Sequence, residues 1–288
     1  MLDDATLKSV GRLAGPNCNG AETAVPRLGF WSGSRPTGHE PAMFDPKIYM
    51  VLQGAKRMTI AGAIHDFGPG DCGVAILGLP FRYEIRTASP ERPYLGVGLT
   101  LDPGMVASVL LDMPGTPAED ATAFAMAPAD QGIRESMSRL VRLAFAPEDV
   151  PVLAPLNERE LLYRLLCSPL GGPLRRIAES RGNVAAIRRA ADRIRTDAAC
   201  PMRVADIANE VGMSQTSFHR QFKAVTGLSP LAYQRHVRLL DAQRRLTAGS
   251  PVTTVAYAVG YRSASQFSRE YRQMFDVPPR AHLRSRAA

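Results

Sequence analysis

Two stretches near the C-terminus combine basic and polar side chains of the kinds that bind nucleic acid. Arg and Lys attract phosphates, Arg can donate two hydrogen bonds to a guanine, and Ser, Thr, Gln and His can reach base edges or the DNA backbone. In both stretches these residues alternate with apolar ones at helical spacing, so that they would share the outer face of a helix. The candidate contact residues are Gln215, Thr216, His219, Arg220, Lys223, Arg262, Ser263, Ser265, Ser268, Arg269 and Arg272.

The two stretches belong to an internal repeat. Gly212 and Phe218 in the first copy correspond to Gly260 and Phe267 in the second, at offsets of 48 and 49 positions. Each copy combines a short apolar helix, a Gly at a tight turn and a second helix with aromatic residues four positions apart. This pattern is typical of a helix-turn-helix unit, whose second helix enters the major groove of DNA. We expect the units at about residues 203–226 and 251–275.

The turn and cap residues of both copies agree with this interpretation. Gly212 and Gly260 suit the left-handed conformation that ends a helix. Ser214 is placed to cap the second helix of the first copy, and Ser263 that of the second. Gln266, three residues after Ser263, would complete a capping box.

The charge of the chain is concentrated in its C-terminal part. The 288 residues include 35 Lys and Arg against 27 Asp and Glu, for a net charge of +8. Residues 173–288 account for +12 and residues 1–172 for −4, which favours an anionic partner for the C-terminal part. Hydrophobic residues make up 45% of the chain, which is a globular composition and excludes a largely disordered protein.

The N-terminal part shows strand patterns followed by helical ones. Between about residues 48 and 101, short apolar runs are separated by turn residues such as Gly54 and the sequence Gly68-Pro69-Gly70-Asp71, which predicts a small β-sandwich or barrel. From Gln131 onward the apolar spacing becomes helical. We expect Asn157 to cap a second helix, with Glu160 completing a capping box. The Pro- and Gly-rich segment at 168–173 then predicts a boundary between domains at 1–172 and 173–288.

With its paired motifs, the C-terminal part resembles the DNA-binding domain of the AraC/XylS family of bacterial transcription regulators. The resemblance covers about residues 183–283 and is carried mainly by the stretch from Val259 to Tyr271, followed by Phe275 and Pro278-Pro279. It departs from the family at Pro201-Met202-Arg203, where the family usually has a Ser or Thr cap. The resemblance implies that the base contacts come from Thr216, His219, Arg220, Ser265 and Arg269.

The N-terminal part is similar to the cupin-type sensing domain of one subfamily of these regulators. The similarity runs from about Tyr49 through the turn at 68–71 to Leu95. It implies a barrel that binds an effector or mediates dimerisation. Metal-binding cupins gather several His ligands, whereas this part has only His39 and His65, so we expect no metal and no cofactor.

We therefore predict an α+β protein of two domains: a cupin-like β-barrel with accessory helices, and an all-α domain with two helix-turn-helix units. The predicted function is a cytoplasmic, sequence-specific transcription regulator without enzymatic activity or a membrane span. Expected partners are double-stranded promoter DNA, an unknown small-molecule effector, RNA polymerase and a second copy of the chain.

Three alternatives remain open at the level of sequence. The barrel could be a metal-dependent cupin enzyme with an accessory basic domain, or the protein could coat DNA without choosing a sequence. Cys72, beside the 68–71 turn, could be a redox or electrophile sensor, but no neighbouring residue guarantees a depressed thiol pKa and a buried, inert thiol is the favoured alternative.

Overall fold

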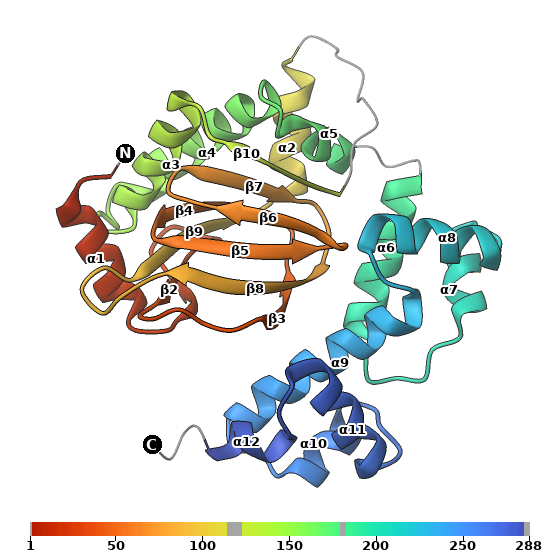
Figure 1. Cartoon of the computed structure of the whole chain (residues 1–288). Coiled ribbons are helices and arrows are strands. Elements are labelled where there is room, and N and C mark those ends of the chain that lie inside the picture. The colour runs from red at the N-terminus through yellow and green to blue at the C-terminus, as the bar shows by residue number, and fades with distance from the viewer. Residues whose placement is uncertain (1, 114–122, 179–182, 285–288) are drawn as a thin grey trace.

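A computed structural model describes residues 2–113, 123–178 and 183–284 (Figure 1). Two antiparallel sheets of the N-terminal part enclose an apolar core, and we call them together the barrel. One sheet has the strand order β1-β2-β9-β4-β7-β10 and the other β3-β8-β5-β6. The strands are β1 (Asn19–Glu22), β2 (Leu28–Gly33), β3 (Glu40–Phe44), β4 (Lys47–Gln53), β5 (Ala55–Ile60), β6 (Ala63–Phe67), β7 (Asp71–Ala75), β8 (Leu79–Thr87), β9 (Tyr94–Thr100) and β10 (Phe124–Pro128).

The expected turns join these strands. Gly54 links β4 to β5 with a φ of 75°, and Gly70 precedes β7 with a φ of 88°, so both positions need the left-handed conformation. In the 68–71 turn the Asp71 carboxylate accepts a hydrogen bond from the Gly68 N–H at 2.7 Å. The prediction of a β-rich N-terminal part is confirmed.

Five helices accompany the barrel within the described residues. They are α1 (Asp4–Ala14), α2 (Pro103–Leu111), α3 (Gln131–Leu143), α4 (Val150–Leu166) and α5 (Gly171–Ala178). Asp130 caps α3 by accepting a hydrogen bond from the Ile133 N–H.

The cap predicted for the following helix is wrong. The helix α4 begins at Val150, with a Pro in its first turn, so that Asn157 lies in its interior and donates a hydrogen bond to the Leu153 carbonyl. Glu160 instead forms ion pairs with Arg139 and Arg164. A side chain that looks like a cap can serve equally well between two packed helices, and local sequence does not separate the two uses.

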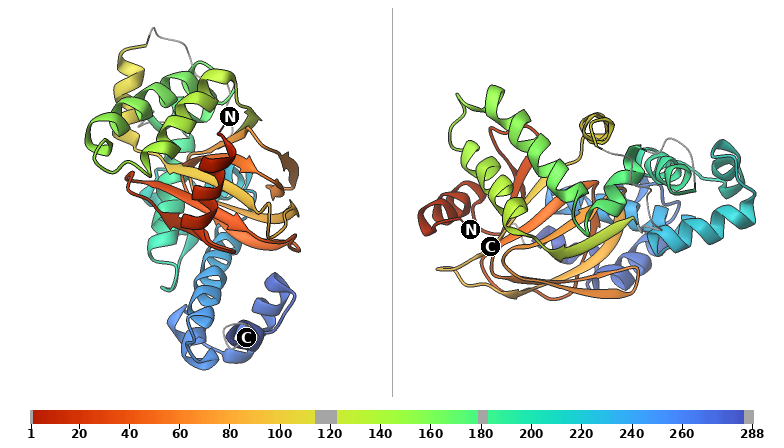
Figure 2. Two further views of the ribbon diagram at one scale, coloured as in Figure 1. Left: turned by 90° about the vertical axis from the view of Figure 1, so that its left-hand side faces the viewer. Right: turned by 90° about the horizontal axis from the view of Figure 1, so that it is seen from above.

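The C-terminal part contains seven helices within the described residues: α6 (Asn183–Thr196), α7 (Val204–Glu210), α8 (Gln215–Thr226), α9 (Pro230–Thr247), α10 (Val252–Ala258), α11 (Ala264–Phe275) and α12 (Pro279–Arg284). They form two apolar cores, one around Phe218 and Phe222 and the other around Phe267 and Tyr271. The long helix α9 runs from the first core, beside the barrel, to the second (Figure 2). An all-α C-terminal part with two helix-turn-helix units is thereby confirmed.

The position of α5 bears on the limit between the domains. Its residues Leu174 and Ile177 are buried in the core of the barrel and its helices. The predicted division after Gly172 stays a prediction, and this packing favours a division a few residues later. None of the helices that the structure describes is long and apolar enough to cross a membrane.

Candidate nucleic-acid interface

The first helix-turn-helix unit consists of α7 and α8. Gly212 has a φ of 72° in the turn between them, as its position predicts. The Ser214 hydroxyl caps α8 by accepting a hydrogen bond from the Ser217 N–H at 3.3 Å. Phe218 and Phe222 are fully buried; their rings pack against each other at a tilt, and the Phe222 ring meets that of Tyr233 of α9 edge to face. This packing turns one face of α8 inward and fixes which residues lie on its outer face.

The outer face of α8 carries all the candidate contact residues predicted for the first unit. Each of them is exposed, and in the described part of the chain Arg220 and Lys223 form no ion pair. The exposed residues are Gln215, Thr216, His219, Arg220 and Lys223.

The second unit, α10 and α11, repeats this construction. Gly260 has a φ of 90° in the turn, and Ser263 caps α11 by accepting a hydrogen bond from the Gln266 N–H at 3.4 Å. The capping box predicted here is only half formed, because among the described residues the Ser263 N–H donates no hydrogen bond to the Gln266 side chain, which itself donates to Glu270 at 3.0 Å. Glu270 also accepts a hydrogen bond from the Tyr261 hydroxyl at 2.8 Å, so its carboxylate joins Tyr261 and Gln266 within the unit.

The outer face of α11 is richer in Arg than that of α8. Ser263 and Ser265 are exposed and Ser268 is half-buried. Ser263 already uses its hydroxyl as a cap, so it has less freedom to bind a ligand than Ser265. The exposed cations, which form no ion pair among the described residues, are Arg262, Arg269 and Arg272.

Arg238 and Gln234 on α9 hold the two units in one arrangement, and sequence reasoning missed both. The Arg238 guanidinium donates hydrogen bonds to the carbonyls of Ala198 at 2.6 Å, Cys200 at 2.9 Å and Gly260 at 3.1 Å. Gln234 donates to the first two of these carbonyls as well. The segment before the first unit and the turn of the second are therefore tied to one side chain. Nothing in the local sequence distinguishes Arg238 from the solvated arginines around it.

Several contacts join these helices to the barrel. The Tyr233 hydroxyl donates to the Gly78 carbonyl at 2.8 Å, and Arg195 pairs with Asp45 at 2.6 Å. A ring nitrogen of His236 lies 3.0 Å from the Ala42 carbonyl, and burial lowers the pKa of this imidazole. Arg82 of β8 donates to the Met274 carbonyl at the end of α11 at 2.8 Å. The barrel therefore contacts both units.

Two further kinds of site were considered for the barrel, a metal site and a reactive thiol. Within the described residues, no three His, Cys, Asp or Glu side chains lie close enough together to hold one metal ion. The Cys72 side chain is fully buried, and this burial raises the pKa of its thiol to about 12. Cys72 is therefore a protonated thiol at neutral pH, which disfavours a role as a reactive sensor.

Comparisons with known protein families match both parts of the chain. Residues 24–173 match the model described as the AraC-type transcriptional regulator N-terminus, and residues 207–285 match a helix-turn-helix domain. Among individual relatives, the HTH-type transcriptional activator RhaS of Pectobacterium atrosepticum is 35% identical over 76 residues. RhaS of Citrobacter koseri is 37% identical over 75 residues. Each match spans 26% of this chain and 27% of the relative.

Solved structures resemble the chain over most of its length. Apo ToxT from Vibrio cholerae superposes with a TM-score of 0.59 at 13% identity, covering 88% of this chain and 96% of that one. ToxT with a bound unsaturated fatty acid superposes with a TM-score of 0.54 at 13% identity, covering 89% and 94% of the two chains. At this identity the likeness shows a shared fold of two domains.

Proposed function

Since the chain belongs to the family of AraC-type transcriptional regulators, we propose that it binds specific DNA sequences through α8 and α11 and regulates transcription in response to a small molecule. The observation that carries this proposal is the pair of outer helix faces, each of which presents exposed cations that have no ion-pair partner in the described part of the chain. Unpaired cations on a structured surface are ready to neutralise phosphates, and the neighbouring polar groups can read bases.

The proposed roles follow from the chemistry of each side chain. Arg220 and Arg269 donate paired hydrogen bonds to guanine, whereas Lys223 and Arg272, one turn further along each helix, contact phosphates. The shorter groups of Thr216 and Ser265 contact bases or the backbone, together with His219. The remaining proposed contacts, which position the helices on the backbone, are Gln215, Arg262, Ser263 and Ser268.

Effector sensing is assigned to the N-terminal domain. A structure of ToxT, which shares the architecture, holds an unsaturated fatty acid, and this supports a small-molecule site in a chain of this design. The proposal makes the protein a cytoplasmic regulator that communicates with RNA polymerase and has no catalytic role.

We further propose that the regulator forms a homodimer through α4. This helix exposes Val152, Leu156 and Tyr163, whose exposed fractions are 67%, 62% and 51%. Their spacing places them along one side of the helix. An exposed apolar stripe of this kind is typical of a surface that another chain covers.

The decisive experiment is the selection of bound sequences from a random duplex pool at about 0.15 M salt, which weakens non-specific attraction. We expect enrichment of a motif with two short boxes about 10 base pairs apart. Arg220→Ala should relax one box and Arg269→Ala the other, with Arg280→Ala, which is not a proposed contact, as the matched control. Binding without an enriched motif would replace this proposal by the alternative that the protein coats DNA without choosing a sequence. An equal loss in both boxes for either variant would overturn the assigned roles.

A further inference from the structure

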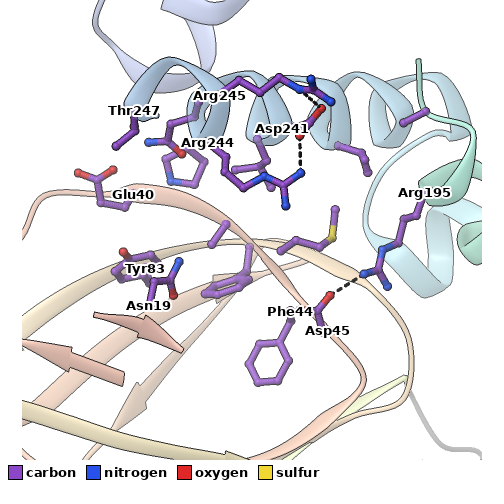
Figure 3. Close-up of a pocket in the computed structure, with 18 of the residues that line it drawn as sticks. Asn19, Glu40, Phe44, Asp45, Tyr83, Arg195, Asp241, Arg244, Arg245 and Thr247 are labelled. Carbon is purple, nitrogen blue, oxygen red and sulfur yellow. Dashed lines mark hydrogen bonds and ion pairs between the residues drawn. The ribbon is translucent and has the colours of Figure 1, made fainter. Parts of the chain in front are cut away.

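A cavity of about 1170 Å³ lies between the barrel and the helices α6 and α9 (Figure 3). Its barrel wall includes the aromatic rings of Phe44, Phe81 and Tyr83, and its helical wall includes Val237 and Leu240 of α9. Small-molecule sites in proteins commonly measure about 300–1,000 Å³ and are mostly apolar with a few polar groups. This cavity is large enough for such a ligand, and it lies where the proposed sensor meets the proposed DNA-binding part.

Most of the charges around this cavity are paired with one another. Arg244 and Arg245 both donate to the Asp241 carboxylate, at 2.6 and 2.8 Å (Figure 3). On the opposite side Asp45 accepts from Arg195 at 2.6 Å and lies 3.7 Å from the Lys47 ammonium. Of the described residues, five cations and four carboxylates line the cavity, and four of the cations have a carboxylate partner.

Lys56 is the exception. It lies on β5, is only 8% exposed, and forms no hydrogen bond or ion pair among the described residues. Its ammonium lies 4.2 Å from the ring centre of Tyr83 and 5.4 Å from that of Tyr49. The attraction of aromatic rings for a cation is weaker than the cost of removing an unpaired ammonium from water.

Among the residues that the structure describes, none near Lys56 supplies a negative charge. Tyr49 and Lys47 face it from β4, Tyr83 from β8 and Tyr94 from β9. Burial raises the pKa of all three phenols, so they are neutral at physiological pH, and the repulsion of Lys47 adds to burial in lowering the pKa of Lys56 to about 7. Glu40 on β3 acts on the Tyr83 hydroxyl and forms no pair with Lys56.

An apolar residue at position 56 would fill this space without the cost of desolvation. Buried groups that lower stability in this way are typical of ligand sites, where the ligand supplies the missing partner. The missing partner here has one negative charge. The arginines of the cavity already have carboxylate partners, so the group left for a ligand is an ammonium and not a guanidinium fork. An ammonium suits a carboxylate better than a phosphate, and the aromatic wall suits an apolar body rather than a sugar.

We propose that the cavity binds a small monocarboxylate, with its carboxylate on the Lys56 ammonium and its apolar body against Phe44 and Phe81. This inference rests on the proposed function, since it names the class and position of the effector. Occupancy would act on DNA binding because α9 forms one wall of the cavity and carries a helix-turn-helix unit at each end. A ligand that favours one spacing of α9 from the barrel shifts the population of that arrangement.

The test uses the intact chain with octanoate and naphthoate as probes and the neutral amides octanamide and naphthamide as controls. Thermal unfolding should show stabilisation by at least one acid and by neither amide. Calorimetry should show proton uptake on binding, with the affinity falling about tenfold between about pH 7.5 and pH 8.5, because the free protein must first protonate Lys56. An amide that binds as well as its acid, or acids that never stabilise the protein, would overturn the proposal.

Variants of Lys56 separate binding from folding. Lys56→Met should abolish acid binding and raise the thermal midpoint of the free protein, because it removes a buried unpaired amine. Lys56→Arg should keep part of the binding but lose its pH dependence, because a guanidinium stays charged. Lys8→Met, on the exposed face of α1, is the matched control and should change neither property. Undiminished binding to Lys56→Met would refute the site.

The same proteins keep this proposal distinct from the proposed function. If Lys56→Met still selects a two-box DNA motif while no acid binds the wild-type protein, the monocarboxylate site is refuted and the regulator stands. If acids bind through Lys56 but the wild-type protein selects no motif with or without them, the ligand site stands and the regulator is refuted.

Discussion

The first helix-turn-helix unit packs against the barrel through buried groups, whereas the second meets it through groups that are partly exposed. Tyr233, at the first unit, is fully buried and bonds to Gly78, and Gly227 after α8 fits tightly against Ala61 of the barrel. At the second unit, Arg82 reaches the last turn of α11, and its side chain is 40% exposed. The first unit is therefore held more firmly against the barrel, while the position of the second depends mainly on α9. If the barrel moves relative to only one of the two helix-turn-helix units, the spacing between the units changes.

The turns of the two units should differ most in their tolerance of a side chain. A Cβ on Gly212 would meet no atom within 4 Å, whereas one on Gly260 would lie 2.2 Å from the Ala199 carbonyl oxygen. Gly212→Ala should therefore lower the free energy of unfolding by about 1 kcal/mol, the cost of a left-handed Ala, and Gly260→Ala by about 3 kcal/mol or more. Urea unfolding of both variants provides the comparison. Equal losses would show that the second turn is not wedged against the 198–200 segment.

The loss of Arg238 should weaken the coupling between the units. Arg238→Met removes the charged donor of four backbone carbonyls, and we expect a loss of about 2–3 kcal/mol in binding to a duplex with both boxes at the selected spacing. Binding to a duplex with a single box should change much less, because each recognition helix remains capped and packed. Titration of the variant with both duplexes measures this difference. Similar losses on the two duplexes would mean that Arg238 supports only the stability of the fold.

The two helix-turn-helix units were predictable from sequence because their signals are local. The roles of Arg238 and Lys56 were not predictable. A Gly in a turn, a Ser at a cap and aromatic residues four positions apart fix α8 and α11 within a dozen residues each. Arg238 and Lys56 gain their significance from carbonyls and rings that are distant in the sequence. Asn157 shows the converse. Its local sequence predicts a helix cap, but its side chain instead accepts a hydrogen bond from Arg139 of α3.

Sequence discrimination should separate the two recognition helices by site. Arg269→Ala is expected to lose about 1–3 kcal/mol of discrimination at particular base pairs in the box read by α11, and none in the box read by α8. Arg220→Ala should show the reverse pattern. Affinities for single-base variants of the selected duplex, measured at one salt concentration, test both expectations. A uniform loss across all sequences would reduce either residue to a phosphate contact.

Removal of the Tyr233 hydroxyl should have a smaller effect on stability. Tyr233→Phe keeps the ring against Phe222 but leaves the Gly78 carbonyl without its donor, which should cost about 1 kcal/mol in the free energy of unfolding. Thermal unfolding of the intact chain measures the loss. Tyr257→Phe, an exposed tyrosine of α10, is the control and should have no measurable effect.

The contact between Arg82 and the second unit should contribute least to stability, and its main effect should be on DNA binding. Arg82 donates to the Met274 carbonyl at 2.8 Å and reaches Asp276, whose side chain is 79% exposed, at 3.5 Å. Exposed ion pairs contribute about 0–1 kcal/mol, so Arg82→Gln should lower stability by less than the loss of the Tyr233 hydroxyl does. Asp276→Asn retains a residue that tolerates the left-handed conformation at this position, where φ is 61°, and should leave stability unchanged.

If the contact holds the second unit away from its DNA arrangement, Arg82→Gln will bind the two-box duplex more tightly than the wild-type protein and a single-box duplex equally well. Weaker two-box binding would instead mean that the barrel holds α11 in the orientation that reads DNA.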